Sequence, residues 1–292
     1  MHMSYASLFV GSHVSTRKGF RNAAVTSESM GAKAFQYFPK NPRSLILKEN
    51  VDWNDAKRCA EYCREQGILS IGHAPYPLNP AVEERRQDVM VDAMLNALEI
   101  VNACGSVGLV VHFGKYSGKD PLQGYKNIIQ CTNKTLRQWT GSALLLLENQ
   151  AGGGSQMGTT MEELTRIRDL SDYPEKIGFC LDTCHFFAAG MWNGEDWARV
   201  EQQGNELGFF DNLKAVHLND SLYPYKSGKD RHANIGSGHI GSHGFRDLLA
   251  SQVVSGIPLV LETESGPDGT HRAEIAALHS LAAAQPGKGS RK

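Results

Sequence analysis

At 292 residues, with 41% hydrophobic and 21% charged side chains, the chain has the composition of an ordinary globular protein, which excludes a mainly disordered one. No apolar run approaches the roughly 20 residues that a membrane span needs, and no basic segment leads into a longer apolar one at the N-terminus. We therefore expect a soluble protein that is not secreted. The formal net charge of −1 neither indicates nor excludes nucleic-acid binding, which depends on a local basic face.

Short apolar runs rich in Val, Ile, Leu and Phe alternate with longer amphipathic stretches along the whole chain, which is typical of strand and helix units with a parallel sheet. Eight strands are predicted, at Ser7–His13, Ala34–Phe38, Leu69–His73, Gly108–His112, Ala143–Glu148, Ile177–Asp182, Leu213–His217 and Pro258–Glu262. A helix-like stretch follows each strand, most clearly at Trp53–Gln66 and Val82–Ala103. Gly67 and Gly105 come shortly after these two stretches, and glycine past the last turn is a common helix stop.

No linker or shift in composition divides the chain, so residues 1–284 are predicted to form one catalytic domain. Its fold is predicted to be an α/β (β/α)8 TIM barrel of eight parallel strands, with the active site at the C-terminal ends of the strands. The alternative is an open doubly wound sheet, which would normally carry a glycine fingerprint after its first strand, where this chain has GSHVSTRKG.

Three segments are predicted to lie outside the regular elements. The starting run MHM is interpreted as a cloning remnant, and residues 285–292, QPGKGSRK, as a flexible basic tail. The glycine-rich run AGGGSQMG after Glu148 lacks the Lys-Ser/Thr ending of a phosphate loop, so we expect a flexible connection from strand to helix.

The six cysteines lie inside predicted helices and strands of a chain far larger than the small disulfide-stapled class. No pair among them has the second CxxC-type partner that a zinc finger needs. We expect all six to be buried, reduced thiols: Cys59, Cys63, Cys104, Cys131, Cys180 and Cys184.

The third to eighth predicted strands each end in a residue that commonly binds metal ions: His73, His112, Glu148, Asp182, His217 and Glu262. In a barrel these strand ends converge on one site. Any one such histidine, taken alone, is more often a hydrogen-bonded structural residue. Together the six favour a metal site, because without cations several carboxylates would lie buried near one another at high cost in free energy.

Three further candidate ligands lie just beyond strand ends. His185 follows Asp182 by three residues in the run DTCH, and Asp230 and His232 stand two apart in DRH. These three form a plausible separate set. Because a zinc ion usually takes about four ligands, nine candidates predict two or three ions.

The chain resembles the endonuclease IV family of apurinic/apyrimidinic endonucleases. The resemblance rests on GSHVS, HAPY, DTCHFFAAG, HLND, DRHANIGSGHIG and PLVLETE, which occur in order over nearly the whole chain. It implies a trinuclear zinc site, with manganese or iron as substitutes that the same ligands accept. The implied ligands are His73, His112 and Glu148 for one ion, Glu148 as a bridge to a second ion held with Asp182, His217 and Glu262, and His185, Asp230 and His232 for the third.

The resemblance also implies the reaction. We expect hydrolysis of the phosphodiester on the 5′ side of an abasic site, leaving a 3′-hydroxyl and a 5′-deoxyribose phosphate, together with a phosphodiesterase activity that cleans 3′ ends. Glu148 is the implied catalytic residue. The expected partner is double-stranded DNA that contains abasic sites. No association with a membrane is expected. The protein is expected to be a monomer inside the cell at the DNA, in the cytoplasm or nucleoid, or in the nucleus of a eukaryote.

Contacts to DNA are implied for a smaller set of residues. The resemblance assigns Arg43 in KNPRS and Tyr76 in HAPY to penetration of the duplex, although composition alone favours a solvated loop charge and a rim aromatic. His13 in GSHVS and Lys115 after the second histidine are candidates for contacting phosphate.

The chain departs from the family pattern at three positions. Pro77 stands where the family usually has an aliphatic wedge, Phe113 replaces the proline of an HPG run, and Ser237 replaces an acidic residue. These departures concern lesion preference and the cleft more than the metal chemistry.

The main alternative function is a metal-dependent sugar isomerase or epimerase on the same barrel. Such an enzyme would hold one or two ions and position a lysine or glutamate as a base, so DxxH together with DRH favours the nuclease. A catalytically dead DNA-binding or scaffold protein would be expected to lose ligands, and all nine are present.

Overall fold

The computed structural model describes residues 8–154 and 157–284. Within these ranges eight parallel strands close into a barrel in the order β1-β10-β7-β6-β5-β4-β3-β2. Their bounds are β1 Phe9–His13, β2 Ala34–Tyr37, β3 Leu69–His73, β4 Gly108–His112, β5 Leu144–Glu148, β6 Ile177–Asp182, β7 Leu213–His217 and β10 Pro258–Leu261. The strand β1 pairs with both β2 and β10, which closes the sheet. The predicted TIM barrel is confirmed, and the open doubly wound sheet is wrong.

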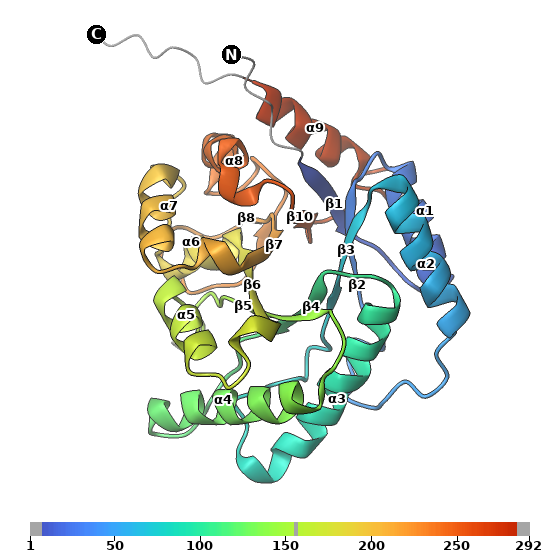
Figure 1. Cartoon of the computed structure of the whole chain (residues 1–292). Helices are drawn as coiled ribbons and strands as arrows, with labels where there is room; N and C mark the ends of the chain where they lie inside the picture. The colour runs from blue at the N-terminus through green and yellow to red at the C-terminus, as the bar shows by residue number, and fades with distance from the viewer. Residues whose placement is uncertain (1–7, 155–156, 285–292) are drawn as a thin grey trace.

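Helices surround the barrel, and at least one follows each barrel strand (Figure 1). Their bounds are α1 Phe20–Ser29, α2 Trp53–Gln66, α3 Glu84–Ala103, α4 Pro121–Gln138, α5 Met161–Asp169, α6 Thr183–Ala189, α7 Trp197–Glu206, α8 Gly241–Ala250 and α9 Arg272–Ala283. Short 3-10 helices occupy Pro174–Lys176, Phe210–Asn212 and Gln252–Val254. The strands β8 Asp220–Ser221 and β9 His232–Ala233 form a small antiparallel pair in the connection after β7.

The observed bounds of β3, β4, β6, β7 and α2 match the prediction, and other bounds differ by one or two residues. One difference concerns the site, because β10 ends at Leu261 and Glu262 is the first residue beyond it. The helix α3 begins at Glu84 rather than Val82, because the Val82 N–H donates to the Asn79 carbonyl in a preceding turn (3.4 Å).

Some predictions concern residues outside the described ranges. These are the run MHM, the start of the first strand at Ser7, positions 155 and 156 of the glycine-rich connection, and the basic tail at 285–292. The division into a domain over 1–284 and a flexible tail therefore stays a prediction.

Two buried layers organise the molecule. The larger one fills the space between the strands and the surrounding helices. The smaller one is a separate cluster of six residues from six strands: Ile71, Val110, Leu146, Cys180, Ala215 and Val260. Each stands two residues before one of the six strand-end ligands. Because side chains alternate along a strand, each ligand points to the same side as the cluster residue before it, into the mouth of the barrel.

Two expectations from composition can be compared with the structure. All six cysteines are buried and free, as predicted. Within the described ranges, every helix is too short or too polar to span a membrane.

Candidate metal centre

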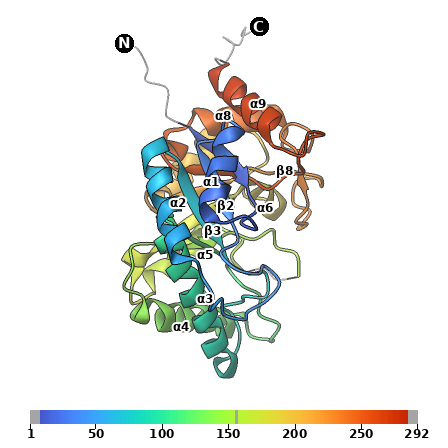
Figure 2. The ribbon, with the colours of Figure 1, turned by 90° about the vertical axis from the view of Figure 1, so that its right-hand side faces the viewer.

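The six strand-end residues lie at the barrel mouth, on the side where the loops after the strands gather (right-hand side of Figure 2). Their burial differs in a graded way. Glu148, Asp182 and His217 are almost completely buried, with exposed fractions of 1%, 0% and 0%. The side chains of Glu262 and His112 are 20% and 38% exposed. The cluster therefore has a buried floor and an accessible rim.

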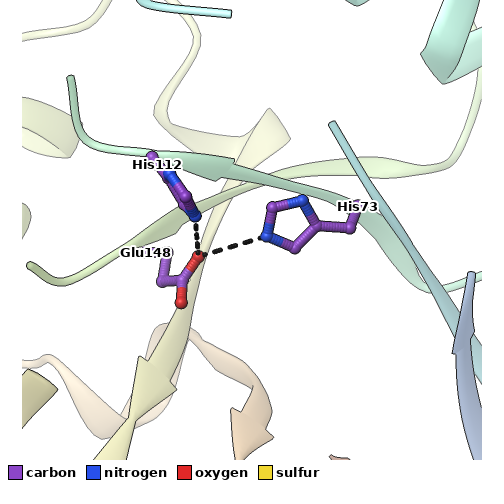
Figure 3. A group of neighbouring side chains, drawn as sticks. All are labelled: His73, His112 and Glu148. Atoms are coloured by element: carbon purple, nitrogen blue, oxygen red, sulfur yellow. Dashed lines mark ion pairs between the residues drawn. The ribbon is translucent and has the colours of Figure 1, made fainter. Parts of the chain in front are cut away.

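Glu148 lies between the pair His73 and His112 on one side and His217 on the other. Figure 3 shows that His73 and His112 point to one carboxylate oxygen of Glu148, with Nε2 atoms 3.6 and 3.3 Å from Oε2. The other oxygen, Oε1, lies 3.0 Å from Nδ1 of His217. One carboxylate thus faces two groups of possible ligands.

The second group surrounds His217. Its Nδ1 lies 3.4 Å from Glu262 Oε2 and 3.9 Å from Asp182 Oδ2. The ligand atoms of Glu148, Asp182, His217 and Glu262 all lie within 4.8 Å of one another, as do those of His73, His112 and Glu148. Each set is close enough to hold a metal ion.

A helix cap explains the DTCH spacing. Asp182 is the N-cap of α6, and its Oδ1 accepts a hydrogen bond from the His185 N–H (2.8 Å). An N-cap side chain binds the second or third helical residue, so the capping contact fixes His185 three positions after Asp182. His185 and His232 both place Nε2 3.2 Å from Asp230 Oδ1, which forms a third group of ligand atoms.

Backbone carbonyls orient three of the histidines. Nδ1 of His73, His185 and His232 lies 2.7, 2.9 and 3.4 Å from the carbonyl oxygens of Ala74, Asn149 and Glu262 respectively. A carbonyl only accepts, so in each ring Nδ1 carries a proton. Each ring then presents Nε2 to the cluster.

Asp220 holds the loop that follows Asp230 and His232 of the third group. Its two carboxylate oxygens accept hydrogen bonds from the backbone N–H groups of Gly236, Gly238, Ile240 and Gly241, at 2.8 to 3.2 Å, and from Ser221 at 2.7 Å. A Cβ at Gly238 would lie 2.5 Å from Asp220 Oδ1 and 2.4 Å from a backbone oxygen, so this position requires glycine. The run IGSGHIG wraps a single buried carboxylate.

The electrostatics of the cluster favour cations. Burial lowers the pKa of His185, but Asp182 and Asp230 overcome that effect and raise it well above its usual value. At His232 the carboxylate of Asp230, 3.2 Å away, likewise outweighs burial and raises the pKa to about 9. Burial raises the pKa of Asp230, yet the two imidazoles, each 3.2 Å away, hold it well below its usual range. The carboxylates around these two imidazoles therefore favour positive charge in the site.

Several buried atoms that point into the cluster lack hydrogen bonds. Within the described residues, Glu148 Oε2, His185 Nε2 and His232 Nε2 are buried and have no hydrogen-bond partner. Such atoms are costly in a folded protein unless another group satisfies them. His112, whose pKa burial lowers to about 4, is neutral near pH 7 and offers a lone pair. These donors fit divalent ions such as zinc.

One further grouping contains Cys184, together with Asp182 and His232. Its thiol donates to the Arg231 carbonyl (3.6 Å), and burial raises its pKa to about 12. Cys184 is therefore a buried free thiol with a backbone acceptor, in agreement with the sequence prediction.

Sequence reasoning missed four polar residues that position the ligands. The amide of Asn149 bonds both the backbone N–H and carbonyl of Asp182, at 2.7 and 3.1 Å. Asn219 donates to Asp182 Oδ2 (2.7 Å) and to Glu262 Oε2 (3.3 Å). The others are Asp220 and Gln36. All are fully or almost fully buried, and a polar residue in the apolar run AFQYF could have identified Gln36.

Two of the predicted DNA contacts lie side by side at the rim. Tyr76 is 59% exposed, and its ring centroid lies 5.3 Å from that of Phe38 and 6.1 Å from that of His73. Its backbone N–H donates to the Pro42 carbonyl (2.8 Å), which joins it to the loop of exposed Arg43. Their role toward DNA stays a prediction.

The other two predicted contacts differ in exposure. His13 packs against Phe38, with ring centroids 4.6 Å apart, and burial lowers its pKa to about 4. Lys115 is exposed, and its backbone is held by two hydrogen bonds to the Asn79 amide. Their proposed contacts with phosphate also stay predictions.

The three departures from the family pattern have different surroundings. Pro77 and Ser237 are exposed. Phe113 is fully buried in the main core, where its ring lies 6.2 Å from that of Tyr125. The phenylalanine therefore changes packing in the main core.

Comparison with known proteins agrees with the fold. A family model described as a xylose isomerase-like TIM barrel matches residues 25–281. The chain is 40% identical over 273 residues to the probable endonuclease 4 of Symbiobacterium thermophilum, covering 93% of this chain and 99% of that protein. It is 37% identical over 275 residues to the probable endonuclease 4 of Heliobacterium modesticaldum, covering 94% and 99%.

Solved structures give two useful comparisons. Endonuclease IV from Thermus thermophilus matches with a TM-score of 0.81 and 29% identity, covering 93% of this chain and 98% of that one. A D-tagatose 3-epimerase-like protein matches with a TM-score of 0.67 and 18% identity, covering 94% and 98%. The second likeness shows a shared fold alone.

Removing the Asp220 carboxylate should release the loop at 234–241. In Asp220→Ala we expect the amides of Gly236, Gly238, Ile240 and Gly241 to exchange hydrogen at least about tenfold faster, since each loses its acceptor. Hydrogen exchange resolved by residue measures this. Asp247→Ala on α8 is the control. Equal protection of the four amides from exchange in both variants would contradict the role of Asp220 in holding this loop.

Proposed function

The chain belongs to the endonuclease IV family, and we propose that it hydrolyses the phosphodiester on the 5′ side of abasic sites in double-stranded DNA. The products are a 3′-hydroxyl and a 5′-deoxyribose phosphate. The same hydrolysis removes blocking groups from the 3′ ends of broken strands. The protein acts as a monomer within the cell, wherever its DNA lies.

The third ligand group is the observation that carries this proposal over a sugar isomerase. The barrel alone supports either function, because the epimerase-like protein shares it. Carbonyl chemistry on a sugar needs one or two ions and a positioned base. Here His185, Asp230 and His232 gather beyond the two groups that share Glu148. A third ion suits phosphoryl transfer, where negative charge must be stabilised at several oxygens.

We assign three zinc ions to the three groups, which manganese or iron could replace because the same ligand types accept them. The ligands are His73, His112 and Glu148; Glu148, Asp182, His217 and Glu262; and His185, Asp230 and His232. When bound, such ions lower the pKa of water and stabilise negative charge on a phosphodiester.

Glu148 is the proposed catalytic residue. Its Oε2 faces His73 and His112, and its Oε1 faces His217, so one side chain sets the spacing of two ligand groups. Its burial excludes bulk water from the carboxylate. A carboxylate held in this way orients the attacking water between the two groups.

Recognition of DNA is proposed to involve the exposed rim. Arg43 and Tyr76 enter the duplex at the lesion, where the missing base lowers the cost of extruding the nucleotide. His13 and Lys115 contact phosphates beside the metal centre.

A duplex with a single tetrahydrofuran abasic analogue tests the reaction. This analogue does not undergo β-elimination, so we expect hydrolytic cleavage that leaves a 3′-hydroxyl. Pretreatment with a chelator should abolish cleavage, and added zinc should restore it. An intact duplex after incubation with fully metallated protein would contradict the assignment. Fewer than about two zinc ions per chain, measured by elemental analysis, would favour the isomerase.

Glu148→Gln tests the bridging carboxylate. We expect turnover to fall by at least about a hundredfold, the order seen when an electrostatic stabiliser is removed, while the barrel stays folded. Single-turnover cleavage and circular dichroism measure the two effects. Glu99→Gln, on the exposed face of α3, is the matched control. Near-normal turnover in Glu148→Gln would show that the bridging role is wrong.

Arg43→Ala tests the rim loop. We expect binding of the damaged duplex to weaken by about tenfold. The slope of log affinity against log salt concentration should also become shallower by about one, because one phosphate contact is lost. Fluorescence anisotropy at several salt concentrations measures both quantities. Arg64→Ala, exposed in the last turn of α2, removes the same charge away from the strand ends. Equal affinities for the two variants would exclude Arg43 from recognition.

A further inference from the structure

Gln36 of β2 lies inside the barrel, although β2 supplies no candidate metal ligand. It is fully buried, and it alternates with Phe35 and Tyr37, which pack in the main core outside the barrel. Its side chain therefore points inward, like those of the ligands. A buried amide needs hydrogen-bond partners, and those of Gln36 belong to the metal centre.

The amide of Gln36 lies between two proposed ligands. Gln36 Nε2 donates to Glu262 Oε1 (2.6 Å), and the His217 Nε2–H donates to Gln36 Oε1 (2.7 Å). Gln36 Nε2 also lies 3.3 Å from Nδ1 of His13. One side chain thus contacts two members of the same ligand group, 181 and 226 residues away in the chain.

The donors and acceptors in this chain of contacts determine one another. The Glu262 carboxylate only accepts, so the NH2 end of Gln36 must face it. The amide oxygen is then left for His217, whose Nε2 must carry the proton. Nδ1 of His217 is consequently the ring atom that faces Glu148, Glu262 and Asp182.

His217 is turned the opposite way from three other ligand histidines. In His73, His185 and His232 a backbone carbonyl holds Nδ1, and Nε2 faces the cluster. In His217 a side chain holds Nε2, and Nδ1 faces the cluster. A side-chain partner can be removed by substitution, which makes the arrangement testable.

We propose that Gln36 is a positioning residue of the metal centre, whose amide fixes His217 in the tautomer that binds through Nδ1 and holds Glu262 in its binding orientation. This inference rests on the proposed function, since it concerns the ion held by Glu148, Asp182, His217 and Glu262. Outer partners of this kind typically change metal affinity by about ten- to a hundredfold.

The test compares zinc binding in the wild-type protein, Gln36→Met and Gln36→Glu. Methionine keeps the length of the side chain without its hydrogen bonds, and glutamate keeps an acceptor for His217 but places a carboxylate against Glu262. We expect zinc affinity at one site to fall about ten- to a hundredfold in both variants, with two ions in place of three remaining after chelator competition. Gln87→Met, which removes another fully buried glutamine that lies on α3, should retain all three.

A second measurement separates positioning from loss of packing. Long-range proton–nitrogen spectra of the zinc-loaded wild-type protein should show His217 with a protonated Nε2 and a zinc-bound Nδ1. In Gln36→Met this single state should be lost. Zinc on Nε2 of wild-type His217, or unchanged affinity and tautomer in Gln36→Met, would overturn the inference alone. Wild-type protein that binds no zinc would overturn the proposed function together with it.

Discussion

The alternation of side chains along six parallel strands is the constraint on which the rest of the structure depends. The residues that fill the barrel, such as Ile71 and Val110, stand two positions before His73 and His112. The packing of the first pair therefore aims the second pair into the mouth. A shift of one residue in any strand would bury a charged group against the helices and turn an apolar one toward the site. Core packing and ligand placement are thus set by the same register.

The cluster places the carboxylates of Glu148 and Asp182 where solvent does not reach, and uncharged amides hold this arrangement. Asn149, Asn219 and Gln36 each donate to a ligand carboxylate or hold the backbone beside it. They orient the oxygens without adding charge, so the demand for cations remains. Asp230 at the rim is exposed, so the solvent exposure of the carboxylates increases from the buried floor to the edge of the cluster.

The sequence predicted those features of the fold that depend on residues close together in the chain. Four strands and α2 have the expected bounds, because alternation and the glycine after α2 are local patterns. The nine candidate ligands come together because strand ends converge in a barrel. Gln36 was missed because the two ligands that it contacts, His217 and Glu262, lie 181 and 226 residues away in the chain. Phe113 was treated as a change to the cleft, whereas its ring lies in the core, because a motif does not specify which way a side chain points.

The hydrogen bonds from main-chain amides to Asp220 affect how the sequence of the loop at 234–241 can vary. The carboxylate contacts the backbone at Gly236, Gly238, Ile240 and Gly241, and none of their side chains. Ser237 and His239 lie between these anchors and are exposed. Their identities can therefore change without moving Asp230 or His232. These two exposed positions of the loop can differ in sequence while the backbone beside the third ligand group keeps its course.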